Sequence, residues 1–64
     1  MLKNRLEEIR MKQFGKSSEE FAEYLELNYK TYSAYENGRY NPPLPKAIMI
    51  AAKIGLPIEY IWYF

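Results

Sequence analysis

The residues best placed to contact another molecule lie between Asn28 and Asn41, where polar side chains recur at helical spacing. At about 100° per residue, a single arc of about 140° carries Tyr29, Lys30, Ser33, Ala34 and Asn37. Thr31, Tyr32 and Tyr35 fall on the opposite side and can be buried. Because one face offers polar groups outward, we expect the function of the chain to lie in this stretch.

The composition excludes most enzyme chemistry. The chain has no cysteine and no histidine, so it can form no disulfide, no zinc site of the usual ligands and no histidine-based general acid or base. Its carboxylates lie in solvated helix patterns, without a nucleophile, a set of metal ligands or a phosphate-binding loop. We therefore expect no catalytic residue, no metal, no cofactor and no small-molecule ligand.

Length and hydropathy indicate the class of protein. A chain of 64 residues makes one domain, near the size at which a single core is only marginally sufficient, so association with a second copy is expected from size alone. No basic leader followed by an apolar segment and no long apolar run is present. We expect a cytoplasmic protein without membrane contact.

The net charge of +1 argues weakly against a nucleic-acid partner, because affinity for phosphate comes largely from clustered Lys and Arg. The charges are nevertheless unevenly distributed. Acidic residues gather at Glu7, Glu8 and between Glu19 and Glu26. The segment from residue 30 to 53 sets four cationic residues against Glu36 alone: Lys30, Arg39, Lys46 and Lys53. Part of the surface can therefore be positive.

The elements that must position the polar stretch begin with a first helix predicted over residues 2–13. Leu2, Leu6 and Ile9 recur there at helical spacing, with charged residues between them. Phe14–Lys16 breaks the pattern.

The next two helices predict a helix-turn-helix. Ser17 and Glu20 have the spacing of a capping box, which starts a helix at Ser18 that continues to about residue 25. Asn28 is a good N-cap for the third helix, over residues 29–37. Helices joined by so short a turn are typical of this motif.

Glycine and proline mark the remaining boundaries. Gly38 can end the third helix in a left-handed conformation. Pro45 fits the first turn of a helix over residues 44–54, which Gly55 ends, and Pro57 opens a short helix over residues 58–62. Without a strand pattern or a repeat, residues 1–64 predict a single all-α domain, a compact five-helix bundle.

Over nearly its whole length the chain resembles the phage repressor and Cro family of helix-turn-helix proteins, the XRE type. The matching residues are Arg10, the segments 17–22 (Ser-Ser-Glu-Glu-Phe-Ala) and 35–38 (Tyr-Glu-Asn-Gly), Asn41-Pro42, Ile50-Ala51 and the segment 54–58 (Ile-Gly-Leu-Pro-Ile). The resemblance implies a lambda repressor-like domain that binds double-stranded operator DNA with its third helix in the major groove.

Residue roles follow from the resemblance by position. It implies that four residues face base edges: Tyr29, Lys30, Ser33 and Ala34. It implies that five others contact phosphates: Ser18, Asn28, Asn37, Arg39 and Tyr40. Arg10 and Glu36 are implied to form a structural ion pair between the first and third helices, while Tyr32 and Tyr35 match core positions.

The chain departs from the family pattern at two positions of the motif. The family usually has glutamine where Ser18 stands, so a long-reaching contact is lost. It usually has glycine where Glu26 stands, and we expect Glu26 to adopt a strained left-handed conformation or the turn to differ.

The last residues of the chain predict an interface. Four of the last five residues are aromatic, more than so small a core can hold, and an exposed apolar patch often marks an interface. We expect a homodimer through Pro57, Ile58, Tyr60, Trp62 and Phe64. The alternative is that Trp62 fills the monomer core while Tyr63 and Phe64 fray.

We therefore expect a transcriptional regulator of the phage or prophage Cro and repressor kind, which blocks transcription by occupying a palindromic operator. The same features also fit the antitoxin of a toxin–antitoxin pair. A third interpretation, suggested by the low net charge and by Ser18 and Glu26, is a protein-interaction module that kept the fold and lost DNA binding.

Overall fold

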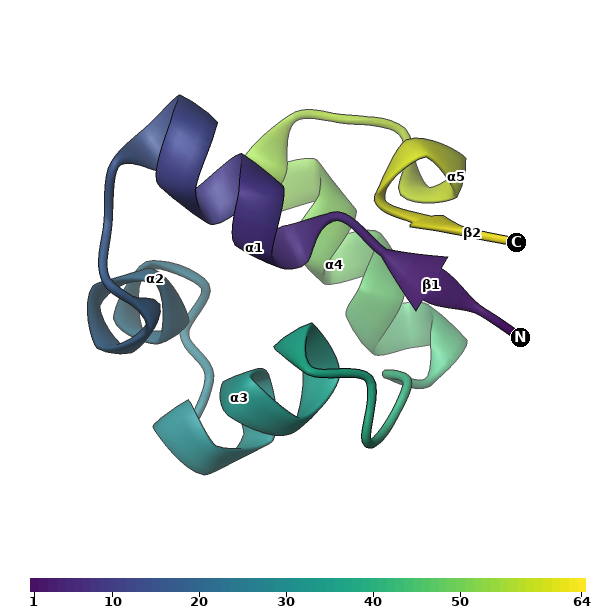
Figure 1. Ribbon diagram of the computed structural model, residues 1–64, viewed down its shortest axis with the longest axis horizontal. Helices are drawn as coiled ribbons and strands as arrows, with labels where there is room; N and C mark the ends of the chain where they lie inside the picture. Colours follow the sequence, from purple (N-terminus) through teal and green to yellow (C-terminus); the bar gives the residue numbers. More distant parts are fainter.

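Five helices and two very short strands surround one apolar core, to which every helix contributes. The computed structural model describes all of residues 1–64. The helices are α1 (Leu6–Ile9), α2 (Ser18–Tyr24), α3 (Tyr29–Glu36), α4 (Leu44–Ile54) and α5 (Ile58–Ile61), and α1 continues into a π-helical segment (Arg10–Phe14). The strands are β1 (Lys3–Asn4) and β2 (Trp62–Tyr63). Helix α4 lies behind α1, and α2 lies at the opposite end of the molecule from the strands (Figure 1). The fold is an all-α helix-turn-helix bundle closed by one short strand pair.

Helix α2 begins and ends through local hydrogen bonds. The Ser17 hydroxyl accepts from the Glu20 N–H at 3.2 Å, and the Glu20 carboxylate accepts from the Ser17 N–H at 3.0 Å, which completes the predicted capping box. At the other end, the N–H of Leu27 donates to the Ala22 carbonyl and the N–H of Glu26 to the Glu23 carbonyl. These two bonds form a Schellman motif, in which Glu26 occupies the position that glycine usually fills.

Glu26 has a φ of 61° and is the only residue other than glycine with a positive φ. The left-handed conformation therefore survives without glycine, at a cost of roughly 1–2 kcal/mol. A salt bridge offsets part of this cost, because Lys53 Nζ of α4 lies 2.8 Å from Glu26 Oε2. The predicted strain is present, and the turn between α2 and α3 keeps the geometry that glycine would give it.

Helix α3 begins at its predicted cap and ends at its predicted glycine. The Asn28 side chain accepts from the Lys30 N–H at 2.8 Å. Gly38 has a φ of 80°, and the next N–H, of Arg39, donates to the Ala34 carbonyl at 2.9 Å. The chain therefore turns back along α3 immediately after the helix ends.

The prediction of a helix from residue 2 is wrong for its first four residues. Lys3 and Asn4 form β1, which pairs antiparallel with β2 in the register Lys3 with Tyr63 and Asn4 with Trp62. The Asn4 side chain then accepts from the Leu6 N–H at 3.0 Å and starts α1 there. Leu2 fits the helical spacing by chance, and in the structure it packs against the core from an extended segment.

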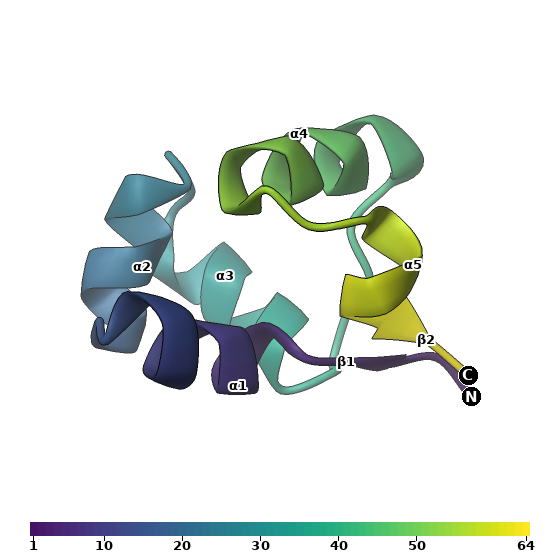
Figure 2. The same ribbon diagram turned by 90° about the horizontal axis from the view of Figure 1, so that it is seen from above.

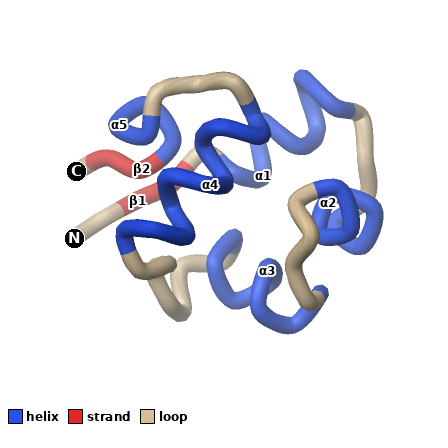
Figure 3. Tube along the Cα trace, turned by 180° about the vertical axis from the view of Figure 1, so that it is seen from behind, coloured by secondary structure: helices blue, strands red, loops and turns tan.

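The prediction for the chain end also needs correction. Helix α5 ends at Ile61, and Trp62 is extended, with φ −112° and ψ 128°. Figures 2 and 3 show the two chain ends side by side, with β1 against β2. Arg5 holds this arrangement, because its N–H donates to the Ile61 carbonyl at 2.8 Å and its guanidinium lies 4.6 Å and 4.0 Å from the ring centres of Tyr60 and Tyr63. Tyr63 therefore does not fray.

No helix of the fold has the length and apolar character needed to cross a membrane.

Candidate nucleic-acid interface

The first three residues of α3 are exposed. Tyr29, Lys30 and Thr31 all lie at the surface, and Ser33 follows them half-buried. The Lys30 ammonium forms no salt bridge and no side-chain hydrogen bond, so all its donors are available to a partner. The remaining side of α3 carries Tyr32 and Tyr35 into the core, as predicted. The helix thus presents its N-terminal end outward, which is the end that helix-turn-helix proteins use for base contacts.

Ala34 does not belong to this exposed face. It is only 7% exposed, because the chain after Gly38 folds over it and the N–H groups of Arg39 and Tyr40 both donate to its carbonyl. Its methyl group is therefore poorly placed to reach a thymine methyl. The prediction for Thr31 needs the opposite correction. Helical spacing places Thr31 on the side that can be buried, but in the structure it is exposed. Helical spacing alone could not show the burial of Ala34, because the segment that covers it lies beyond the end of the helix.

Four of the five predicted phosphate contacts lie around the two ends of α3. Asn28 and Asn37 are exposed, and each uses its side-chain oxygen on a backbone N–H, of Lys30 at 2.8 Å and of Arg39 at 3.3 Å. Their amide N–H groups remain free, and these are the donors that a phosphate accepts from. Arg39 is exposed and forms no salt bridge, and Tyr40 lies exposed beside it.

Ser18 is the least favourable member of the phosphate set. It is the first residue of α2 and half-buried, and its neighbours Glu19 and Glu20 carry negative charge in the same helical turn. Hydrogen bonds from Ser17 lower the pKa of Glu20, so this carboxyl is ionised at neutral pH. A phosphate near Ser18 would meet this charge, and we expect the contact there to be weak.

An ion pair fixes the far end of α3 to the first helix. Arg10 Nε donates to Glu36 Oε1 at 2.9 Å, with the two side chains only 13% and 17% exposed. The Tyr32 hydroxyl donates to the same carboxylate oxygen at 2.6 Å, and Arg10 Nη1 donates to the Lys16 carbonyl at 2.9 Å. The predicted ion pair is thus present, and both of its partners have further hydrogen bonds.

The contacts of this network favour the protonated forms of Arg10 and Tyr32. The hydrogen bond with Glu36 raises the pKa of Arg10, and burial together with Glu36 raises the pKa of Tyr32 far above its ordinary value. Tyr32 therefore keeps its proton, and its hydroxyl remains a donor to the carboxylate at any ordinary pH.

Sequence reasoning missed a second tie to α3. The Asn4 side-chain amide donates to the Tyr35 carbonyl at 3.0 Å, while its oxygen starts α1. One asparagine thus joins the beginning of α1 to the end of α3. The only sign in the sequence was that Asn4 precedes the apolar helix position Leu6 by two residues. An asparagine there is a common helix cap and does not indicate a contact with a distant helix.

The structure buries some residues of the predicted dimer interface and leaves others exposed. Trp62 is 8% exposed and belongs to the monomer core, so its assignment to an interface is wrong in the monomer. Ile58 is half-buried against that core. Pro57 and Tyr60 are exposed, and Phe64 is 89% exposed. The available apolar surface at the chain end is therefore smaller than predicted and centred on Phe64.

Two helices joined by a tight turn, with the second exposed at its N-terminal end, define a helix-turn-helix domain. The helix-turn-helix family model HTH_3 matches residues 6–61, and the chain belongs to this XRE-type family. It is a DNA-binding transcription regulator of that type, and the family is not an enzyme family. A search of curated proteins finds no match to the chain.

The hydroxyl of Tyr32 gives a direct test of the network. Tyr32→Phe removes only the donor to Glu36, and hydrogen bonds to charged groups contribute about 1.5–3 kcal/mol. We expect the free energy of unfolding in urea to fall by about that amount. Tyr35→Phe is the matched control, because the Tyr35 hydroxyl forms no hydrogen bond, and it should change stability by less than about 0.5 kcal/mol. Equal losses in the two variants would contradict the assigned role of Tyr32.

Proposed function

We propose that this protein is a sequence-specific regulator of the phage or prophage Cro and repressor kind, which binds a palindromic operator as a homodimer and blocks transcription there. The observation that carries the proposal is the outward first turn of α3, with its unpaired Lys30, on a helix whose other end is tied to α1 by Arg10 and Glu36. Operator occupancy requires no catalytic group, and the protein would act in the cytoplasm, where its operator is accessible.

The proposed mechanism places α3 in the major groove. The Lys30 ammonium donates to guanine O6 and N7, a contact worth roughly 1–3 kcal/mol of discrimination. Tyr29 and Ser33 offer hydroxyls to base edges or to the backbone beside them, and Thr31 adds an exposed hydroxyl and methyl to the same turn. Asn28, Asn37, Arg39 and Tyr40 then hold phosphates on either side, which fixes the register of the helix without reading sequence.

The distribution of unpaired charge supports this mechanism despite the low net charge. Lys30, Arg39 and Lys46 form no salt bridge, whereas Glu36, the acidic residue between them, is bound to Arg10. On α3 and the segment after it, the unpaired charges are therefore both cationic, Lys30 and Arg39. Phosphate contacts depend on such local clusters more than on the sum of charges.

The difference from the family pattern at Glu26 does not support the interpretation that the chain is a protein-interaction module that has lost DNA binding. Glu26 takes the left-handed conformation and pairs with Lys53, so the connection between α2 and α3 keeps a Schellman geometry. Glu26 lies in the turn and not on α3. Glutamate in place of the family's usual glycine therefore leaves the proposed base-contacting residues of α3 unchanged.

A homodimer would supply the second half-site. Phe64 extends beyond β2 almost fully exposed, and Pro57, Ile58 and Tyr60 lie in and before α5, near the same chain end. A two-fold contact at this end would place two α3 helices about 34 Å apart, one turn of DNA, and would require a palindromic operator.

Substitutions at Lys30 and Arg39 separate base reading from phosphate holding. The preferred site is first selected from a random pool of duplexes, and affinities are then measured on that site and on single-base variants of it. Lys30→Ala should weaken the preferred site by about 5- to 150-fold and relax one base position, because its contact discriminates between bases. Arg39→Ala should weaken every sequence alike.

The two variants serve as controls for each other, since both remove an exposed, unpaired cation. Equal losses for Lys30→Ala on every sequence would remove Lys30 from the base-reading set. Failure of the pool to yield any preferred site would contradict the proposed function itself.

Phe64 provides the test of the dimer. Phe64→Ser removes an exposed ring and leaves the core residues, including Trp62, in place. Sedimentation equilibrium should show self-association of the wild type that the variant weakens by tenfold or more, roughly the contribution of one buried aromatic ring. Met11→Ser, at an exposed apolar position on the π-helical segment, should leave association unchanged. A monomeric wild type, or loss of association in both variants, would exclude the proposed interface.

A further inference from the structure

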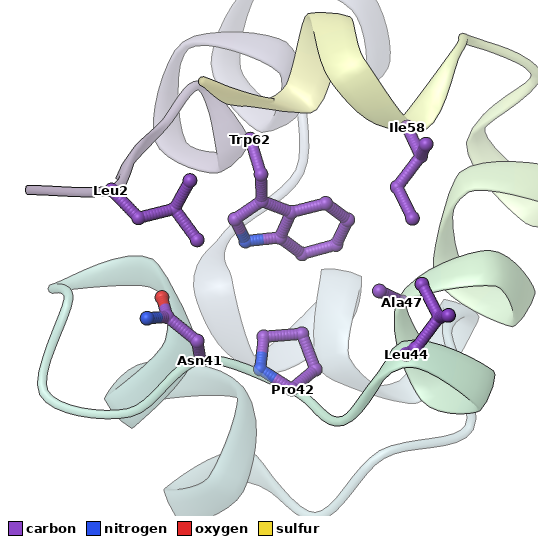
Figure 4. A pocket seen from close by; sticks show the side chains of 7 residues that line it. All are labelled: Leu2, Asn41, Pro42, Leu44, Ala47, Ile58 and Trp62. Atoms are coloured by element: carbon purple, nitrogen blue, oxygen red, sulfur yellow. The ribbon is translucent and has the colours of Figure 1, made fainter. Parts of the chain in front are cut away.

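An open pocket of about 210 Å³ lies where β2 meets the connection between α3 and α4 (Figure 4). Residues far apart in the sequence form its walls: Leu2 precedes β1, Asn41 and Pro42 lie in the connection, and Ile58 and Trp62 come from the chain end. Five of its seven lining residues are hydrophobic. No sequence pattern predicted this pocket, because its walls meet only when the two chain ends pair.

The pocket contains the one buried side-chain nitrogen or oxygen of the protein that has no hydrogen-bond partner, Trp62 Nε1. Burial of an N–H donor without an acceptor is unfavourable, and buried indole N–H groups usually find a partner. Figure 4 shows the indole nitrogen on the side of the ring that faces Asn41. The unsatisfied donor therefore lies on the same side of the pocket as Asn41, an exposed polar side chain of the pocket wall.

The side chains of the pocket offer few partners to a water that is ordered at this nitrogen. A buried water needs two to four polar partners, and among the lining side chains only Asn41 and Trp62 carry polar atoms. Apolar walls with a single fixed donor suit an apolar molecule that brings its own acceptor. Such molecules are the usual occupants of mostly apolar pockets in which a few polar groups fix the orientation.

We propose that this pocket binds a small apolar molecule, one ring with a short substituent, whose single carbonyl-type oxygen accepts from Trp62 Nε1. The size follows from the volume, since a dry cavity of about 150 Å³ is enough for benzene. The nitrogen is covered in the structure, so binding of the acceptor requires a neighbouring side chain to move; the proposal assigns this movement to Asn41, which is exposed and lies on the nitrogen's side of the ring. The Asn41 amide N–H then supplies a second donor to the same oxygen.

The proposal goes beyond operator binding and can be tested without DNA. The chain has one tryptophan, so the indole N–H gives a single cross-peak in a nitrogen–proton correlation spectrum. Acetophenone is the probe, and α-methylstyrene is its control, since it has the same shape with a methylene group in place of the carbonyl oxygen. Acetophenone should move the indole proton downfield in a saturable way, with a Kd on the order of 1 mM for so small a ligand. The control should leave the proton without that downfield shift.

A pair of variants locates the site. Ala47 lines the pocket and Ala52 is exposed on the same helix, so Ala47→Leu fills the pocket and Ala52→Leu does not. Ala47→Leu should weaken acetophenone binding at least tenfold, while Ala52→Leu leaves it unchanged. If Ala47→Leu does not fold, the comparison of the two probes on the wild type still decides the proposal.

Three outcomes would overturn it. These are a linear, non-saturating response to acetophenone, the same response to both probes, and an indole peak that moves with protein concentration alone. The last would show that a second copy of the chain covers the pocket. Because no DNA is present, none of these results bears on operator binding, and failure to bind an operator would leave the pocket assignment intact.

Discussion

The ion pair between Arg10 and Glu36 is the interaction on which the presentation of α3 depends. Both charges are largely removed from water, yet each has a second partner, the Lys16 carbonyl for Arg10 and the Tyr32 hydroxyl for Glu36. A buried pair satisfied in this way holds its geometry, whereas loss of one partner leaves a buried charge at a cost of about 3–5 kcal/mol. With its far end fixed to α1, α3 can leave its first turn exposed without losing its orientation.

Backbone conformations at the helix ends do the rest of the positioning. The left-handed residues Glu26 and Gly38 stand at the ends of α2 and α3, and each closes a Schellman motif that reverses the chain. The first reversal sets the angle between the two helices of the motif. The second brings Arg39 and Tyr40 back along α3 and buries Ala34 beneath them. The groups that we propose contact phosphates are thereby placed beside the groups that we propose read bases, although they follow them by several residues.

Local chemistry explains which parts of this structure the sequence could predict. Ser17, Asn28 and Gly38 act on backbone groups within a few residues of themselves, so their effects are visible in the sequence. The pairing of β1 with β2 joins Asn4 to Trp62, and neither residue carries a local sign of the other. The tie from Asn4 to α3 and the pocket both follow from that distant pairing and could be found only in the folded chain. The burial of Trp62 was one of two alternatives in the sequence, and the pairing decides between them.

The central claim is that the surface of α3 and the segment after it binds DNA, and a salt titration tests it most directly. Binding to a random duplex is measured from about 50 to 200 mM salt, the range in which phosphate contacts weaken strongly. The logarithm of the binding constant should fall linearly with the logarithm of salt concentration, and Arg39→Ala should make the slope shallower by about one. A flat or absent response would show that phosphates do not hold this protein, and the account of α3 as a DNA-binding helix would then be wrong.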